Sequence, residues 1–508
     1  MPIPRRALLA APFLASRAAV AAPPASAAHL PRWRGFNLLE KFDRAHPQPF
    51  READFDIIAG WGFDFVRLPL HYRVWTEAPG RYDERQLAEI DQAVRWGRAR
   101  GIHVDLCLHT APGYNVGDGY AEERAAGLDL WGEGEPGEAA RAQFAEQWRM
   151  FAARYRGIPA AALSFNLVNE PPEISGETYL RSARPAVEAI RREDPGRLII
   201  ADGAGGTDGG RLPVPALIPL GLAQSTRGYR PLALSHYRAP WMLGADMWPV
   251  PTWPVRNVMN QFLFGAEKPQ FQSPLTLAVD LPARTALGVH IAYVSGHAQL
   301  VVGANGAREF DRTLRPTPDG GGWKRLIDTP TPGAWQALYD TDLTAELPAG
   351  TREITLEVLD GDWLTFSQLS LASPGRRIEL TPGLSAWPVR QQRFTLAADG
   401  EPVPAHGAAT YGRDDLWRDE ILPWQRLQAQ GVGVHVGEWG CNMWTPHAVA
   451  LAWMRDNLAN FRRAGWGWAL WNLRGELGPL DSGRPDVRYE AWRGHRLDRA
   501  MLDLLRGG

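Results

Sequence analysis

The chain has 508 residues, 55 basic and 57 acidic, and 45% of its residues are hydrophobic. This length exceeds one typical hydrophobic core, so we expect more than one compact unit. A formal net charge of −2 provides no basic surface for DNA, RNA or an anionic membrane, and no nucleic-acid partner is expected. The 22 tryptophans suit large cores and also proteins that stack aromatic rings on sugars.

Residues 1–28 predict a signal peptide. A twin-arginine pair, Arg5 and Arg6, precedes an apolar run and small residues suited to cleavage. The apolar run is too short to span a bilayer, and no later segment reaches that length. We therefore expect a secreted or periplasmic protein without a membrane span.

The two cysteines, Cys107 and Cys441, are too few for a disulfide framework or a tetrahedral cysteine site. One bridge between them and two buried thiols remain alternatives.

From about residue 33, short apolar runs alternate with amphipathic stretches such as 83–101, where apolar residues recur at three- and four-residue steps. Successive strand and helix units predict a parallel sheet. The predicted strands are 34–39, 63–70, 103–109, 163–169, 197–203, 232–237, 433–439 and 467–473. Eight strands predict an α/β fold, a closed (β/α)8 TIM barrel.

Between the sixth and seventh predicted strands the pattern changes. Residues 268–395 contain alternating apolar and polar stretches separated by Gly, Pro, Asp and Asn turns. This pattern predicts an antiparallel β-sandwich. We interpret it as a domain inserted into a loop of the barrel, which itself comprises 29–267 and 396–508.

Chemistry in a parallel barrel lies at the C-terminal ends of the strands, where the βα-loops form an open mouth. The predicted strand ends carry Arg67, His109, Asn169, Glu170, His236, Tyr237, Glu438 and Trp471. Two carboxylates facing each other across a sugar-sized gap are the machinery of glycoside hydrolysis. An isolated Asn-Glu-Pro could be a turn with a solvated side chain, but the second strand-end glutamate weakens that alternative.

Structural roles remain alternatives for three of these residues. Arg67 could form a structural ion pair, His109 could be a hydrogen-bonded core histidine, and Trp471 could pack the barrel.

Four motifs together resemble glycoside hydrolase family 5, the cellulase family of clan A. They are "NEP" at 169–171, "GEWG" at 437–440, "VRLP" at 66–69 and the tail "GWGWALWNLRGELGPLDS" at 465–482. The resemblance covers about 30–265 and 400–508. The insertion resembles an accessory carbohydrate-binding module, with a structural lid over the groove as the alternative.

The resemblance implies a retaining double displacement in which Glu170 is the general acid/base and Glu438 the nucleophile. A carboxyl group beside a second negative charge has a raised pKa, and that charge disappears when the nucleophile becomes an ester. One glutamate can therefore act first as acid and then as base. Arg67 would keep Glu438 ionised, and Asn169 would hydrogen-bond the sugar 2-hydroxyl.

The resemblance also implies substrate contacts. His109 matches the family's strand-three histidine, and Trp471 would form the floor beneath the sugar at the cleavage site. Trp444 is a further candidate for lining a subsite. The family usually shows His-x-Tyr at the end of strand six, whereas "SHYRAP" at 235–240 would place either Arg238 in the tyrosine slot or Ser235 in the histidine slot.

We expect hydrolysis of a β-linked glucan, with an endo-β-1,4-glucanase as the first hypothesis. A mannanase, a xylan-cleaving enzyme, an exo-β-glucosidase and a catalytically impaired carbohydrate-binding protein are the alternatives. No serine-hydrolase elbow, P-loop or metalloprotease motif is present in the sequence. The expected partner is a polysaccharide or oligosaccharide bound to a monomer, with no cofactor and no metal.

Overall fold

The computed structural model describes residues 24–508 except 118, 206–209, 243, 329–334 and 386–388. Most of the predicted signal peptide therefore lies outside the described residues. Within the described part of the chain, no helix has the length and apolar character needed to cross a membrane.

Eight parallel strands form a closed barrel, as predicted. In chain order they are β1 (Arg34–Asn37), β2 (Phe65–His71), β5 (His103–Ala111), β7 (Leu163–Asn166), β8 (Leu198–Asp202), β9 (Ala223–Gly228), β20 (Val434–Trp439) and β21 (Trp468–Leu470). Each strand pairs with the next, β21 pairs with β1, and every pairing is parallel. The closed ring brings the C-terminal ends of all eight strands to one mouth.

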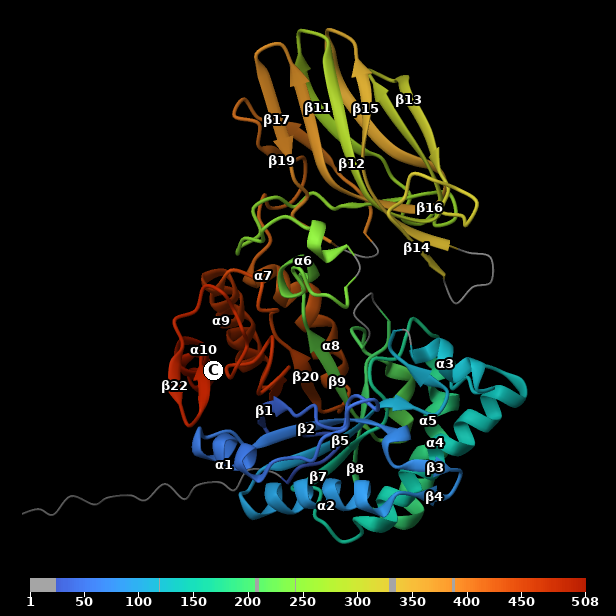
Figure 1. The fold of residues 1–508 in the computed structure, drawn as a ribbon, viewed down its shortest axis with the longest axis vertical. Coiled ribbons are helices and arrows are strands. Elements are labelled where there is room, and N and C mark those ends of the chain that lie inside the picture. The colour runs from blue at the N-terminus through green and yellow to red at the C-terminus, as the bar shows by residue number, and fades with distance from the viewer. Residues whose placement is uncertain (1–23, 118, 206–209, 243, 329–334, 386–388) are drawn as a thin grey trace, which may run out of the picture.

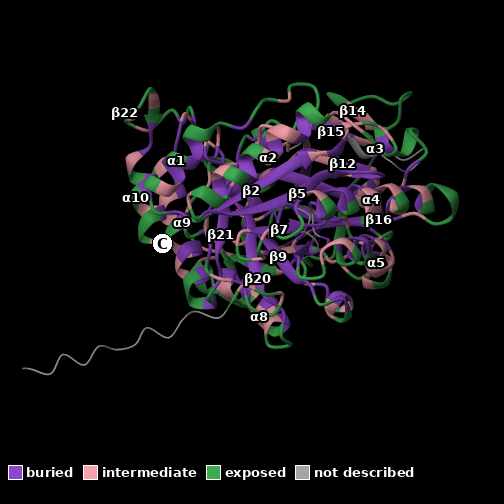
Figure 2. Ribbon diagram, turned by 90° about the horizontal axis from the view of Figure 1, so that it is seen from below, coloured by how far each residue is buried: buried purple, intermediate pink, exposed green. Residues whose placement is uncertain are grey.

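Helices surround this ring, and the barrel strands lie buried at its centre (Figure 2). The longer helices are α1 (Glu52–Gly60), α2 (Glu84–Ala99), α4 (Gly134–Arg154), α5 (Gly176–Glu193), α9 (His447–Ala464) and α10 (Arg499–Gly507). Shorter ones are α3 (Gly119–Ala125), α6 (Leu232–Ser235), α7 (Arg413–Leu416) and α8 (Leu422–Gln428), with single turns η1 (Tyr72–Val74), η2 (Pro215–Leu220), η3 (Ala245–Met247) and the π-helix η4 (Trp417–Ile421). Short two-stranded elements lie outside the ring, namely β3 (Thr76–Ala78) with β4 (Arg81–Tyr82) and β22 (Glu490–Trp492) with β23 (His495–Leu497), while β6 (Tyr114–Asn115) pairs back onto β5.

Helix α2 illustrates how the sequence sets these elements. The Asp83 carboxylate accepts hydrogen bonds from the backbone N–H groups of Arg85 and Gln86, which caps the first turn. Leu87, Ile90 and Val94 are buried along one face, as the three- and four-residue spacing predicts.

The sixth barrel strand is β9, and the prediction of a strand at 232–237 was wrong. Residues Leu232–Ser235 form helix α6 instead. Strand β9 has the sequence AQSTRG, yet all six residues are buried. Its Gln224 side chain, for example, exchanges hydrogen bonds with the backbone of Val214. A search for apolar runs passes over such a strand because its polar side chains are satisfied inside the barrel.

The insertion follows β9 and forms a ten-stranded sheet with its own hydrophobic core. Its strands run from Phe262 to Pro404, whereas the sequence pattern placed the domain at 268–395. They are β10 (Phe262–Phe264), β11 (Leu275–Leu281), β12 (Thr285–Ala304), β13 (Ala307–Leu314), β14 (Arg325–Asp328), β15 (Trp335–Leu347), β16 (Thr351–Ser373), β17 (Arg376–Leu380), β18 (Arg393–Leu396) and β19 (Pro402–Pro404).

The pairing is antiparallel except between β11 and β18. The long strands β12 and β16 pair with each other through several register shifts, and each changes its outer neighbour along its length. Such irregularities let one strand serve two layers of a sandwich. Figure 1 shows this domain beyond the barrel, with α6 between the two. The chain leaves and re-enters the barrel side by side, because Val255 and Tyr411 pair through two backbone hydrogen bonds of 2.9 Å.

The barrel wall tolerates no side chain at Gly35. This glycine pairs with Phe65 across β1 and β2, and an added Cβ would lie 1.7 Å from the Phe65 carbonyl oxygen. We expect Gly35→Ala to lower the free energy of unfolding by about 3 kcal/mol or more, because backbone must move. Gly60→Ala is the matched control, since a Cβ there meets nothing within 4 Å. Urea denaturation of both variants tests this, and equal midpoints would contradict it.

Candidate active site

Two glutamates lie at the barrel mouth. Glu438 is in β20 and is 4% exposed, and Glu170 lies in the loop after β7 with its side chain 12% exposed. Glu438 Oε1 accepts a hydrogen bond from Arg67 Nη1 at 2.6 Å, and Oε2 accepts one from the Tyr229 hydroxyl at 3.1 Å. Both oxygens of Glu438 are thus held, which fixes the plane of its carboxylate.

Glu170 has a different electrostatic environment. Its Oε1 accepts a hydrogen bond from Arg227 Nε at 2.8 Å. Burial, and after it the negative charge of Glu438, raises the pKa of Glu170 to about 8, against the opposing effect of Arg227. This shift favours the protonated form of Glu170 near neutral pH, which is the form that can donate a proton.

Asn169 presents an amide N–H to the mouth. Its Oδ1 accepts hydrogen bonds from Arg67 Nη2 and Arg227 Nη2, both at 2.8 Å. Two cationic donors on one atom identify that atom as the oxygen. Its Nδ2 is buried and has no hydrogen-bond partner among the described residues, so this donor is available to a ligand hydroxyl.

Arg67 is fully buried and is held from several strands. Besides Glu438 and Asn169, it donates to the following atoms: Asn37 Oδ1 at 3.1 Å, Asn166 Oδ1 at 3.0 Å and Cys107 Sγ at 2.9 Å. Arg67 is a satisfied buried cation, and one of its partners is the Glu438 carboxylate.

Aromatic rings border the glutamates. Phe42 contacts His109 and Trp471, with ring centroids 4.5 Å and 5.6 Å away. Burial, with the positive charges of Arg67 and Arg227, holds the pKa of His109 well below its usual range. His109 is therefore neutral, and its Nδ1 has no partner among the described residues.

The structure moves His236 and Tyr237 away from the predicted strand end. Both follow helix α6. The His236 ring contacts the ring of Tyr229, with the two centroids 5.0 Å apart. Tyr237 belongs to a buried cluster with Tyr229 and Trp471. Trp444 is 39% exposed, and the Arg238 guanidinium lies 5.4 Å from its ring centroid.

Three residues of the site were missed by sequence reasoning: Asp202, Arg227 and Tyr229. The segment Arg227-Gly228-Tyr229 ends β9, so the tyrosine contact to Glu438 is present. This corrects the expectation based on "SHYRAP". In the His-x-Tyr pattern expected at the end of strand six, Tyr229 takes the tyrosine position and Arg227 takes the histidine position. The Arg-x-Tyr spacing was visible in the sequence, but only after the strand had been placed correctly.

Both cysteines are free thiols and buried. Of the two alternatives, the structure therefore has two buried thiols. No group of three His, Cys, Asp or Glu residues in the described ranges could hold a metal ion.

Part of the chain is similar to a known protein family. The model of the family described as "Cellulase (glycosyl hydrolase family 5)" matches residues 26–231. Residues 26–231 are therefore similar to a glycosyl hydrolase family 5 domain. The match includes Arg67, Asn169, Glu170 and the end of β9, whereas Glu438 lies beyond it.

Two kinds of relative match part of the chain. Endoglucanase C of Acetivibrio thermocellus is 30% identical over 165 residues, 32% of this chain and 45% of that protein. A probable glucan 1,3-beta-glucosidase A of Aspergillus terreus is 33% identical over 121 residues, 24% of this chain and 28% of that protein. The chain thus spans less than half the length of these relatives.

One solved structure is similar along most of the chain. It is a crystal structure described as a glycoside hydrolase, 27% identical with a TM-score of 0.59, and the match covers 94% of this chain and 99% of the other. This similarity includes the region outside the family 5 domain match.

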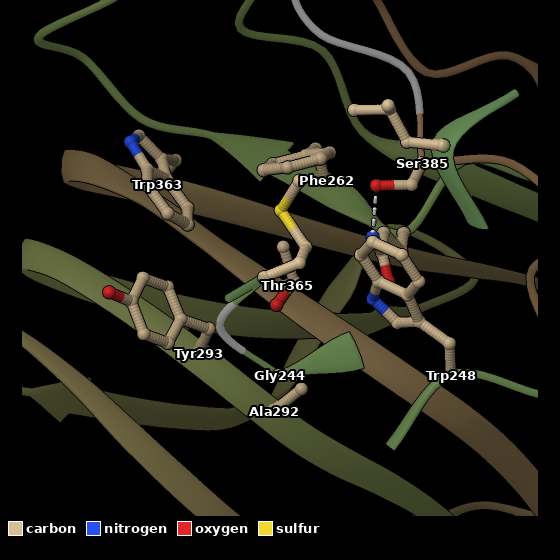
Figure 3. Close-up of a pocket in the computed structure, with 11 residues that line it drawn as sticks. Gly244, Trp248, Phe262, Ala292, Tyr293, Trp363, Thr365 and Ser385 are labelled. Atoms are coloured by element: carbon tan, nitrogen blue, oxygen red, sulfur yellow. Dashed lines mark hydrogen bonds between the residues drawn. The ribbon is translucent and has the colours of Figure 1, made fainter. Parts of the chain in front are cut away.

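The barrel side of the molecule meets the inserted sandwich at a cavity of about 150 Å³ (Figure 3). Trp363, Tyr293 and Phe262 line it from the sandwich, and Trp248 faces them from the loop after α6. The Trp363 and Tyr293 rings are stacked, 5.4 Å apart. Trp248 also packs in the buried cluster with Tyr229 and Trp471. The sandwich is therefore packed against the loop that supports the active site.

Proposed function

We propose that the chain is a retaining glycoside hydrolase that cleaves β-linked glucans, with endo-β-1,4-glucanase activity as the first hypothesis. One observation carries the proposal: the Glu170 and Glu438 carboxyl groups contact the same guanidinium group, that of Arg227, at 2.8 Å and 3.3 Å. This bridge favours the short carboxyl separation of retaining enzymes, about 5–5.5 Å, over the wider gap of inverting ones.

In the first step, Glu438 attacks the anomeric carbon while Glu170 donates its proton to the leaving oxygen, which breaks the glycosidic bond and forms a glycosyl ester. In the second step, Glu170 takes a proton from water, and the water oxygen displaces Glu438. Asn169 Nδ2 donates a hydrogen bond to the sugar 2-hydroxyl, and the Trp471 ring packs against the C–H groups of the sugar.

A glucan 1,3-β-glucosidase activity is the second candidate, because relatives with that name match alongside the endoglucanases. Mannan and xylan remain possible substrates of the same mechanism. The alternative of an impaired binding protein rested on an altered strand-six contact to Glu438. Tyr229 makes the tyrosine contact, which argues against this alternative, and Arg227 is the part of the strand-six pattern that stays altered.

The test is to incubate residues 29–508 with β-1,4-glucan, β-1,3-glucan, mannan, xylan and aryl β-glycosides, and to identify the released sugars. Release of oligosaccharides from β-1,4-glucan supports the first hypothesis, and release of glucose from β-1,3-glucan supports the second. Binding without release from any substrate overturns both.

The raised pKa of Glu170 makes activity depend on pH. Glu170 must be protonated in the first step, and its pKa is raised to about 8. We expect kcat/KM on unactivated glycans to persist through neutral pH and to fall about tenfold per unit above that value. A kcat/KM profile measured at constant ionic strength checks this. If kcat/KM instead fell with rising pH near the ordinary pKa of a glutamate, the result would contradict this expectation.

We also propose that the chain acts outside the cytoplasm, because residues 1–28 have the pattern of a signal peptide. N-terminal sequencing of protein recovered outside the cytoplasm should then begin near residue 29. Recovery of only uncleaved protein inside the cytoplasm would contradict export.

A further inference from the structure

Arg227 has no donor left for a substrate. An arginine side chain carries five N–H donors, and each has a partner here. The partners are Glu170 Oε1 at 2.8 Å from Nε, Ser225 Oγ and the Thr226 carbonyl oxygen at 3.3 Å from Nη1, and Asn169 Oδ1 at 2.8 Å and Asp202 Oδ2 from Nη2. Its side chain is fully buried. Arg227 must therefore act through the residues that it holds.

Asp202 anchors both Arg227 and the Glu170 backbone. This carboxylate is fully buried at the end of β8, and Oδ2 accepts from Arg227 and from the Glu170 backbone N–H, the latter at 3.0 Å. Oδ1 accepts from Asn166 Nδ2 at 3.0 Å. Glu170 itself has a φ of +45°, a conformation that costs free energy for a residue with a side chain. The Asp202–Arg227 pair thus holds Glu170 at its backbone and at its carboxyl group.

We propose that Arg227 is a positioning residue which, anchored on Asp202, holds the Glu170 carboxyl group in one orientation during both steps of the reaction. The inference rests on the proposed function and extends it.

The charges around Glu170 explain why the cation matters in the second step. Glu438 from β20 and Asp202 from β8 disfavour the Glu170 carboxylate, whereas Arg227 from β9 favours it. Arg67 from β2 and the Tyr229 hydroxyl complete the polar surroundings on the Glu438 side. When Glu438 becomes a neutral ester, one negative charge disappears while Arg227 remains. The balance then shifts toward the carboxylate, the form that removes a proton from water.

The experiment compares Arg227→Lys with the double variant Arg227→Met/Asp202→Asn. The double variant removes both buried charges, so neither is left unpaired, and circular dichroism and thermal melting verify its fold. We expect a tenfold to hundredfold lower kcat with KM changed less than threefold. Its alkaline limb should move up, because Arg227 lowers the pKa of Glu170 through its charge and its hydrogen bond more than the Asp202 charge raises it. Arg227→Lys keeps the positive charge but cannot make the five hydrogen bonds of the guanidinium group. We therefore expect kcat to fall while the alkaline limb of the pH profile stays in place.

A second measurement does not depend on turnover. Carboxyl ¹³C NMR of glutamate-labelled protein, with Glu170→Gln to assign the signal, should show the Glu170 titration displaced upward in the double variant and unchanged in Arg227→Lys. The inference would be overturned if the double variant kept the wild-type pKa of Glu170 and the wild-type alkaline limb of its pH profile, while kcat fell equally at every pH. Wild-type protein without glycosidase activity would overturn the proposed function, while the NMR titration still decides whether Arg227 controls Glu170.

Discussion

Glu438→Gln should abolish turnover and leave glycan binding in place. The amide keeps the size of the carboxylate but cannot form the glycosyl ester, so we expect kcat to fall on the order of 10⁴-fold or more. The Arg67 contact can persist on the amide oxygen as a neutral hydrogen bond, although the ion pair at 2.6 Å is lost and the Tyr229 hydroxyl then faces the amide nitrogen. Reducing-sugar release and isothermal titration with an oligosaccharide measure the two effects separately.

The matched control for this variant is Glu188→Gln, an exposed glutamate on α5. It should be as active as the wild type. If Glu438→Gln retained more than a small fraction of the activity while Glu188→Gln behaved normally, Glu438 could not be the nucleophile.

Glu170→Ala should have an effect that depends on the leaving group. Without a proton donor, hydrolysis of a glucan should slow by about 10²–10⁴-fold. An aryl glycoside with an acidic phenol needs no protonation, so formation of the glycosyl ester should be much less affected and its breakdown should become rate-limiting. Added azide, a nucleophile that needs no general base, should then restore turnover and yield a β-glycosyl azide.

Retention of configuration in that azide product also tests the double displacement. Glu173→Ala, in the same loop and exposed, is the control and should neither lose activity nor respond to azide. An α-glycosyl azide, or equal losses on glucan and on activated glycosides, would contradict the acid/base role of Glu170.

The closed barrel and most of its strands could be predicted from the sequence, because buried apolar strands leave a periodic trace. Strands β2, β5 and β8 are of this kind. Strand β9 could not be found in this way, since its Gln224, Ser225 and Arg227 are polar. Their hydrogen-bond partners, among them Glu170, are brought to them only by the folded barrel. The more apolar segment that follows Pro231 attracted the prediction and proved to be helical.

The wrong placement of the sixth strand also determined which site residues could be predicted. Glu170, Glu438, Arg67 and Asn169 follow from strand ends that were placed correctly, and the structure brings these four together. Arg227 and Tyr229 were missed with β9. Asp202 ends a predicted strand, but nothing in its neighbourhood in the sequence indicates that it lies beside two arginines.

The paired segments at Val255 and Tyr411 have a consequence for how such a protein can diversify. Because the chain enters and leaves the insertion at adjacent points, a short loop could replace the whole sandwich without reordering any barrel strand. Arg230, the neighbour of Tyr229, nevertheless donates a hydrogen bond to the Ser385 carbonyl oxygen at 3.3 Å. A lineage that exchanged the sandwich would therefore keep its barrel but lose this contact beside Tyr229, the residue that donates a hydrogen bond to Glu438.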